Sequence, residues 1–315
     1  MAAILIYSDK TTLALELLNA AKLIAKNNNF PIKAVSINND DQAEELAAKG
    51  AETYKIINPE LSLSDTAAMA AALRQAAENV DADTVLLSSN RRGKELAGRL
   101  AQVINAGCLT DVKSLINENG SIQCVRNVLG GATIAIQQIT TDKKVIAISP
   151  KAFAAATDEA GGSINECLVN INPSRIKLIE TRAKAGDSVD IEAAEILVVV
   201  GQGVESQENL PAIMEIAKNL GGEVACSKPV ATDKKWFGEE RIVGLSGKIC
   251  KPDLAIILGV SGQVQFTVGI RDAKTIVSIN SDEKAYMNQM ADYVLVADLK
   301  EVLPELVSST LENQK

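Results

Sequence analysis

The residue types best suited to bind a ligand lie in the second half of this 315-residue chain, where apolar runs end. The clearest segment is Gly259-Val-Ser-Gly-Gln-Val-Gln-Phe266, which directly follows the apolar run 254–258. Small residues at the end of a buried strand expose backbone amides, and such amides bind phosphates or the polar edge of a cofactor. The segment therefore predicts a binding site for a phosphate-bearing or heterocyclic ligand.

Two other glycine segments resemble phosphate-binding turns without completing the pattern. Gly201-Gln-Gly203 lies between a strand-like and a helix-like run, but position 206 is Ser where GxGxxG requires a third glycine, so an ordinary turn remains an alternative. Gly244-Leu-Ser-Gly-Lys248 resembles the end of a P-loop, but Ile249 stands where Ser or Thr is required. We therefore do not expect nucleotide hydrolysis at this second segment.

Further polar residues follow other apolar runs of the same half. Each has a simpler interpretation, because Lys228 is also typical of a solvated lysine, and Asn280 and Asp298 are also typical of turns. The carboxyl ends of parallel strands meet at one edge of a sheet, where ligands bind. Because all of these residues are expected at that one edge, a single extended cofactor could contact them together. They are Gln202, Ser227, Ser246, Ser261, Asn280 and Asp298.

Composition excludes several kinds of chemistry. The chain has no histidine, which excludes Ser–His and Cys–His nucleophiles and removes the commonest transition-metal ligand. The five cysteines form no CxxC pair, so neither a zinc site nor a disulfide framework is indicated, and we expect reduced, partly buried thiols. We expect no metal site and no catalytic residue.

Charge and hydropathy indicate the surroundings of the protein. A net charge of −8 argues against binding to nucleic acid or to an anionic membrane. Apolar runs such as 196–200 are far shorter than the roughly 20 residues that cross a bilayer, so no membrane span is expected. The sequence enters a strand-like run at residues 3–7 without a signal-peptide pattern, which favours a cytoplasmic protein.

The first half alternates strand-like and helix-like segments, which predicts a parallel sheet covered by helices. The expected strands are 3–7, 32–37, 53–57 and 84–89, and the expected helices are 13–26, 42–49, 64–79 and 92–106. From residue 108 to about 150 shorter β-like pieces follow, and we expect them to extend or cap this sheet.

The second half predicts another α/β unit. Its expected strands are 196–200, 223–227, 253–258, 275–279 and 293–297, and its expected helices are 209–219 and 300–311. The weakly periodic region before it places the interdomain connection near residues 175–192. The predicted fold class is α/β with two domains, 1–185 and 192–315, each with a mainly parallel sheet flanked by helices, the second of nucleotide-binding, Rossmann-like type.

The sequence of the C-terminal half resembles a known family, the α subunit of electron transfer flavoproteins. The motifs that carry the resemblance, at similar separations, are Gly259-Val-Ser-Gly-Gln-Val-Gln-Phe266, Thr275-Ile-Val-Ser-Ile-Asn280, Ala291-Asp-Tyr293 and Val296-Ala-Asp-Leu299. The N-terminal half is similar more loosely, through residues 109–112 and 140–150. The resemblance therefore covers essentially the whole chain, with its specificity after residue 195.

The resemblance implies an electron carrier without substrate turnover of its own. It implies FAD in the C-terminal domain, and a heterodimer with an electron transfer flavoprotein β subunit that the first domain contacts. It also implies an electron donor such as an acyl-CoA dehydrogenase, as in fatty acid β-oxidation. The flavin contacts that it implies are Gln202, Ser227, Lys228, Val243, Gly244, Leu245, Ser246, Ser261, Gly262, Gln263, Val264, Gln265, Phe266, Asn280 and Asp298.

Five of these positions depart from residues that are usual in the family. Arg is common at Gln202 and Lys228, His at Phe266, Gln at Leu245 and Thr at Ser246. Phe266 offers no proton donor, so we expect a one-electron potential about 60 to 130 mV below that of a relative with His, less if Lys228 reaches the ring.

Two other interpretations of the chain remain. The substitutions also fit a family member with weakened or lost flavin binding that acts as a nucleotide-binding or assembly subunit. A free-standing nucleotide-binding α/β protein without a redox role is the third.

Overall fold

The computed structural model describes residues 3–26, 30–118, 121–131, 133–157, 161–172, 174, 176–180 and 189–312. The chain divides into two compact units, an N-terminal unit, Met1–Thr181, and a C-terminal unit, Arg182–Lys315. The expected connection near residues 175–192 includes positions 181–188, which lie outside the described residues.

The N-terminal unit contains nine strands and four α-helices among its described residues. In chain order they are β1 (Ala3–Tyr7), α1 (Thr11–Ala25), β2 (Ile32–Ile37), α2 (Asp40–Ala48), β3 (Glu52–Ile56), α3 (Thr66–Asn79), β4 (Ala82–Ser88), α4 (Arg91–Ile104), β5 (Gly107–Glu118), β6 (Ser121–Val128), the 3₁₀ helix η1 (Leu129–Gly131), β7 (Thr133–Gln138), β8 (Lys144–Ile148) and β9 (Ile164–Glu166).

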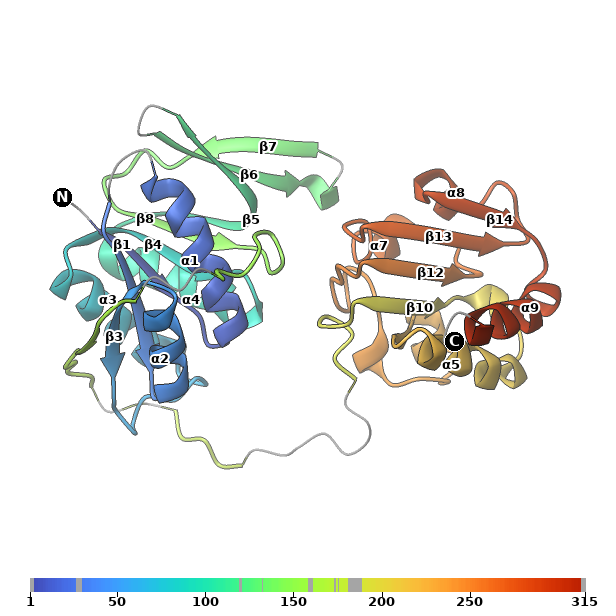
Figure 1. Ribbon diagram of the computed structural model, residues 1–315, viewed down its shortest axis with the longest axis horizontal. Coiled ribbons are helices and arrows are strands. Elements are labelled where there is room, and N and C mark those ends of the chain that lie inside the picture. The colour runs from blue at the N-terminus through green and yellow to red at the C-terminus, as the bar shows by residue number, and fades with distance from the viewer. Residues whose placement is uncertain are drawn as a thin grey trace. The chain divides into compact units, whose positions relative to one another are not determined.

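The nine strands form one sheet in the order β7-β6-β5-β8-β4-β1-β2-β3-β9. Its parallel part is covered on both faces because its central strand β1 is apolar on both faces, with Leu5 and Tyr7 on one face and Ile4 and Ile6 on the other. Helices α3 and α4 pack on the first face, and α1 and α2 pack on the second (Figure 1).

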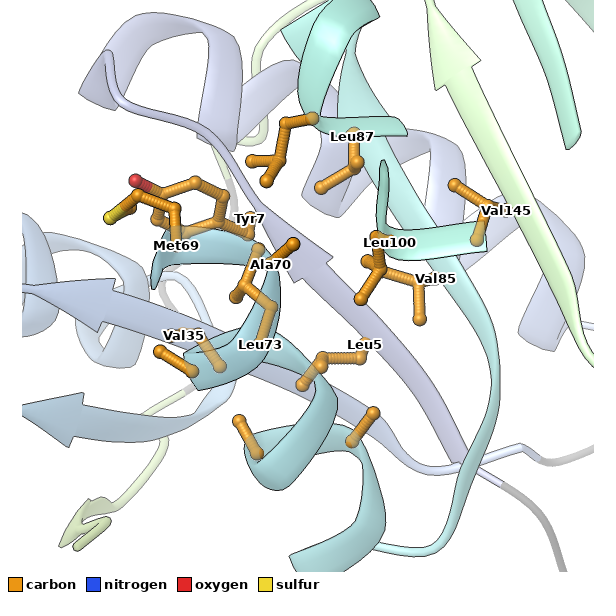
Figure 2. Close-up of a cluster of buried hydrophobic side chains, with 14 of the residues drawn as sticks. Leu5, Tyr7, Val35, Met69, Ala70, Leu73, Val85, Leu87, Leu100 and Val145 are labelled. Carbon is orange, nitrogen blue, oxygen red and sulfur yellow. The ribbon is translucent and has the colours of Figure 1, made fainter. Parts of the chain in front are cut away.

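Figure 2 shows the core between the sheet and helices α3 and α4. Side chains from the strands and the two helices meet without an intervening polar layer, as expected for a parallel sheet under helices. The labelled residues are Leu5, Tyr7, Val35, Met69, Ala70, Leu73, Val85, Leu87, Leu100 and Val145.

The region after residue 107 extends the sheet, as its short β-like pieces predict. Strand β6 pairs antiparallel with β5 on one side and with β7 on the other, and β5 joins the parallel part through β8. Strand β9, which pairs parallel with β3, was not predicted. Its residues Ile164, Asn165 and Glu166 are all exposed, so they carry no alternation between apolar and polar side chains.

The C-terminal unit contains five strands and five α-helices among its described residues. They are β10 (Ile196–Val200), the 3₁₀ helices η2 (Gln202–Val204) and η3 (Gln207–Asn209), α5 (Leu210–Asn219), β11 (Glu223–Cys226), α6 (Lys228–Thr232), the 3₁₀ helix η4 (Glu239–Arg241), β12 (Leu254–Leu258), α7 (Val264–Thr267), β13 (Thr275–Asn280), α8 (Tyr286–Met290), β14 (Tyr293–Val296) and α9 (Leu299–Glu312).

These five strands form a fully parallel sheet in the order β11-β10-β12-β13-β14. Strand β10 is buried on both faces, because Val198 and Val200 pack on the side of α5 and α9, while Leu197 and Val199 pack on the opposite side. The strand order reverses at β10 and β12, and ligands bind beyond the carboxyl ends of the strands at such a point. The predicted fold class is confirmed for both units.

No described helix combines the length and the apolar character needed to cross a membrane. Within the described ranges, no three His, Cys, Asp or Glu side chains are grouped so that they could hold a metal ion.

Candidate cofactor site

The turns after β10 and β12 are in direct backbone contact at the point where the strand order reverses. Gly201 N–H donates to Leu258 O at 2.8 Å, and Gly203 N–H donates to Gly259 O at 2.9 Å. A Cβ atom on Gly201 would lie 2.2 Å from Gly259 O, and Gly259 itself has a φ of +63°. The glycines at 201 and 259 are therefore required by this close approach of the two turns.

A cavity that opens to solvent lies beside these two turns. It is formed by the segments that follow β10, β12, β13 and β14, so it lies at the edge that the sequence predicts. Its lining residues are Gly203, Val204, Glu205, Asn209, Gly259, Asn280, Ser281, Asp298, Leu299 and Lys300.

Asn280 and Asp298 line this cavity, and both side chains also bond to the backbone. Asn280 Nδ2 donates to Val260 O at 2.9 Å, and its Oδ1 accepts from Asp282 N–H at 3.0 Å. Asp298 precedes α9, and its Oδ1 accepts from Lys300 N–H at 2.9 Å, which is a capping interaction. Both residues fix the walls of the cavity and retain only part of their hydrogen-bonding capacity for a ligand.

The segments 243–246 and 261–266 come together, as expected for contacts of one cofactor. Leu245 N–H donates to Gln265 O at 2.7 Å. Gly244 has a φ of +134°, and a Cβ atom there would lie 2.5 Å from the same Gln265 oxygen. Val243 is buried and donates its N–H to Cys226 O at 2.9 Å, which ties this segment to the end of β11.

The turn Ser261–Gly262 lies against the start of α8. Met287 N–H donates to Ser261 O at 3.2 Å. Gly262 has a φ of +86°, and a Cβ atom there would lie 2.2 Å from Met287 N. This position therefore requires glycine, and the Ser261 side chain next to it is exposed.

Several predicted contacts keep their polar side chains available for a ligand. Within the part of the chain that the structure describes, these side chains have no hydrogen-bond partner in the protein, and Ser227 is in addition only 7% exposed. Hydroxyls, carboxamides and one ammonium are donors that suit a diphosphate and the heteroatoms of a flavin ring, so the donor set fits FAD. The residues are Gln202, Ser227, Lys228, Ser246, Ser261, Gln263 and Gln265.

Phe266 has a different environment from its neighbours. Its ring is 7% exposed and belongs to an apolar cluster with Leu197, Val199 and Met287, and its N–H donates to Gln263 O at 2.9 Å. By contrast, Leu245 and Val264 are 67% and 55% exposed. The apolar side chains that this edge presents to solvent are therefore Leu245 and Val264 rather than Phe266.

Sequence reasoning missed residues that shape the rim of the cavity. Lys300 Nζ lies 3.2 Å from Glu205 Oε2, and this carboxylate raises the pKa of the Lys300 ammonium. The turn after β10 is also contacted by Lys234, whose Nζ donates to Gln202 O at 3.0 Å. The two lysines lie far from residues 202–205 in the sequence, so no local spacing indicates these contacts.

Comparison with known proteins adds to this geometry. Residues 190–271 match the family described as "Electron transfer flavoprotein FAD-binding domain", and residues 11–180 match the "Electron transfer flavoprotein domain". Protein FixB of Escherichia coli O81 (strain ED1a) is 32% identical over 309 residues, which is 96% of this chain and 96% of that protein. Protein FixB of Shigella flexneri has the same identity and the same coverage.

Among solved structures, MurG of Acinetobacter baumannii is 11% identical with a TM-score of 0.35, over 100% of this chain and 92% of that one, which is too low to bear on the fold. The family matches and the identity to FixB agree with the FAD-compatible donor set at the edge of the second sheet. The chain belongs to the electron transfer flavoprotein family as an α-subunit, FixB-type member, and its cofactor is FAD.

Proposed function

We propose that this chain is the FAD-carrying α subunit of a heterodimeric electron carrier. It pairs with an electron transfer flavoprotein β subunit and passes electrons from a flavin dehydrogenase, such as an acyl-CoA dehydrogenase, to an acceptor. The observation that carries the proposal is a set of polar side chains at one edge of the second sheet, Ser227 among them, that have no hydrogen-bond partner among the described residues. Although Ser227 is only 7% exposed, its hydroxyl is still reachable from solvent, so a ligand can bind it without displacing a protein partner.

We assign the predicted contacts to three parts of the cofactor. The backbone and side chains of 261–265, together with Ser227 and Lys228, suit the diphosphate. The segment 243–246 suits the flavin ring through the exposed side chains of Leu245 and Ser246, together with the Gln202 carboxamide. Asn280 and Asp298, on the wall of the cavity, suit the adenosine hydroxyls and amine.

When bound, FAD supplies the redox chemistry, and the protein positions it and tunes its potential. The exposed Leu245 and Val264 side chains offer apolar surface to a flat ring, and a bound ring would remove them from water.

Co-expression with a β-type partner tests the proposal. We expect the two chains to co-elute in gel filtration, with one FAD per α chain and with flavin absorbance that bleaches when a reduced acyl-CoA dehydrogenase is added. Tryptophan fluorescence of the flavin-free complex, to which this chain contributes its single tryptophan, Trp236, should fall when FAD is added. A stable complex that purifies without flavin and does not take it up would instead support the assembly-subunit interpretation.

A matched pair of serine variants tests the site. Ser227→Ala should raise the Kd for FAD about tenfold or more, because a hydrogen bond to a charged group is worth about 1.5 to 3 kcal/mol. Ser308→Ala is the control, since Ser308 lies on α9 and its hydroxyl donates to Pro304 O at 3.1 Å, away from the cavity. Equal affinity of both variants would remove Ser227 from the site.

A further inference from the structure

The turn that follows β10 has a strained backbone. It consists of η2 (Gln202–Val204) and Glu205, which has a φ of +47° and a ψ of −57°. For a residue with a side chain this conformation costs about 1 to 3 kcal/mol and persists only when the surroundings hold it. Glu205 N–H donates to Gln202 O at 3.2 Å, which closes the turn but does not by itself explain its conformation.

Lys234 holds this turn from another segment of the unit. Its Nζ donates to Gln202 O at 3.0 Å and to Glu205 O at 3.4 Å, so one ammonium contacts both ends of the turn. The same Nζ lies 4.2 Å from the centre of the Trp236 ring, within the range of a cation–π contact. The ring and the two carbonyls together fix the position of the charge.

The segment that carries Lys234 is itself anchored to α6. Lys234 N–H donates to Pro229 O at 3.1 Å, and Trp236 N–H donates to Val230 O at 3.2 Å. Helix α6 begins directly after Ser227, one of the predicted cofactor contacts. Lys234 therefore connects two of the predicted contact segments, the turn after β10 and the start of α6.

The charge of Lys234 is not neutralised by a carboxylate among the described residues, where its partners are two carbonyls and one ring. Lys300, on the other side of the same turn, is paired with Glu205 at 3.2 Å. Lys228 is exposed and has no fixed side-chain partner within the described ranges. Of these three lysines, only Lys234 combines a fixed position with an uncompensated charge.

We propose that Lys234 is a positioning residue of the flavin site. It holds the Gln202–Glu205 turn in its binding conformation and adds positive charge that favours the anionic diphosphate of FAD. The inference rests on the proposed flavin site at this edge of the sheet. A fixed charge needs no reordering when the cofactor binds, so its contribution to affinity is not reduced by lost side-chain entropy.

Four variants of the αβ complex test the inference. Lys234→Gln and Lys234→Met remove the charge, and Lys234→Arg retains it. Lys235→Gln is the matched control, because the exposed Lys235 side chain has no hydrogen bond, ion pair or ring contact in the described residues. The Kd for FAD is measured by flavin fluorescence at several salt concentrations. Thermal unfolding of each flavin-free complex is followed in parallel.

We expect both neutral variants to bind FAD about tenfold more weakly, which is about 1.4 kcal/mol, and to show a smaller dependence of Kd on salt. Lys234→Arg and Lys235→Gln should stay within about threefold of the unmodified complex. A merely structural role would lower the unfolding temperature without changing the salt dependence, and that result would overturn the inference. Unchanged affinity of the neutral variants, or equal loss in Lys235→Gln, would also overturn it, whereas failure of the unmodified complex to bind FAD would overturn the proposed function instead.

Discussion

Individual residues at the cofactor edge take their roles from partners that are distant in the sequence. Asn280 bonds to the carbonyl of Val260, and Lys234 bonds to the carbonyl of Gln202, 32 positions away. The type of each residue alone indicates a turn or a solvated charge. The role that we propose for each residue depends on the carboxyl ends of the strands lying side by side.

The role of Phe266 also depends on its tertiary surroundings. Replacing it with His tests whether its side chain points toward the flavin. The ring lies in an apolar cluster, so Phe266→His should lower the free energy of unfolding by about 1 to 3 kcal/mol, because imidazole nitrogens would be buried without partners. Because the side chain at this position points into the apolar cluster, the potential of bound FAD should change by less than about 60 mV, which is less than the 60 to 130 mV expected from the residue type alone. Urea unfolding and redox titration of the αβ complex measure the two quantities.

Phe266→Leu is the control, since it reduces packing without adding a polar group. A potential that rises by about 60 to 130 mV in Phe266→His, with stability no lower than in Phe266→Leu, would show that the side chain at this position reaches the flavin.

At the scale of elements, helix positions are set by a few close contacts at their ends. Helix α4 (Arg91–Ile104) begins with Asn90, whose Oδ1 accepts from Gly93 N–H at 2.8 Å. The first turn of this helix also lies directly on the end of β4, because a Cβ atom on Gly93 would be 1.7 Å from Ser88 O. The glycine therefore permits the packing of strand end and helix start.

Two glycine substitutions in α4 should have opposite effects. Gly93→Ala should destabilise the protein by about 2 kcal/mol or more, because the methyl group meets backbone that must move. Gly98→Ala should stabilise it by about 0.5 to 1 kcal/mol, because nothing lies within 4 Å of the added atom and alanine favours the helix. Urea unfolding of the two variants checks both signs, and equal destabilisation would contradict this account of the contact at Ser88.

Asp65 makes the start of α3 sensitive to acid. Its side chain accepts hydrogen bonds from the Ser174 hydroxyl and from the N–H groups of Ala67 and Ala68, and these bonds lower the pKa of the carboxyl. A lowered pKa in the folded state gives stability that is present at neutral pH and is lost as the pH falls below about 4.

Asp65→Ala should therefore cost about 1 kcal/mol at pH 7 and should reduce the loss of stability between pH 4 and pH 2. Asp65→Ser keeps a capping oxygen without the charge, so it should retain most of the stability at pH 7 and share the weaker acid dependence. Urea unfolding at both ends of the range measures this. An acid dependence unchanged in both variants would show that other carboxyl groups account for it.

The sequence predicts the elements better than their contacts. The ends of helices and strands with strong periodicity, such as α4 and β10, are predicted to within two residues. In these elements the spacing of apolar residues shows which faces are buried. Strand β9 has no such pattern, since Ile164, Asn165 and Glu166 are exposed and are held by pairing with β3. The contact of Lys234 with the turn after β10 could not be predicted from the sequence either, because it depends on tertiary structure and not on local spacing.

At the scale of the whole molecule, few groups are expected to gain or lose a proton near neutral pH. The chain has no histidine, and among the described residues the resolved pKa shifts lower carboxyl groups and raise thiols, tyrosines and one lysine. None of these shifts moves a group into the range between pH 5.5 and 7.5. The net charge of −8 is therefore nearly constant over this range.

The free energy of unfolding should accordingly change by less than about 0.5 kcal/mol between pH 5.5 and 7.5, because folded and unfolded chains bind the same number of protons there.

Introducing a histidine should make the stability depend on pH in this range. In Phe266→His, a buried imidazole stays neutral in the folded state, so the unfolded state binds more protons below about pH 6.5, and stability should fall as the pH is lowered. Phe266→Leu should stay as flat as the unmodified chain. Urea unfolding at pH 5.5, 6.5 and 7.5 checks all three, and a step near pH 6.5 in the unmodified chain would reveal a carboxyl group with a strongly raised pKa.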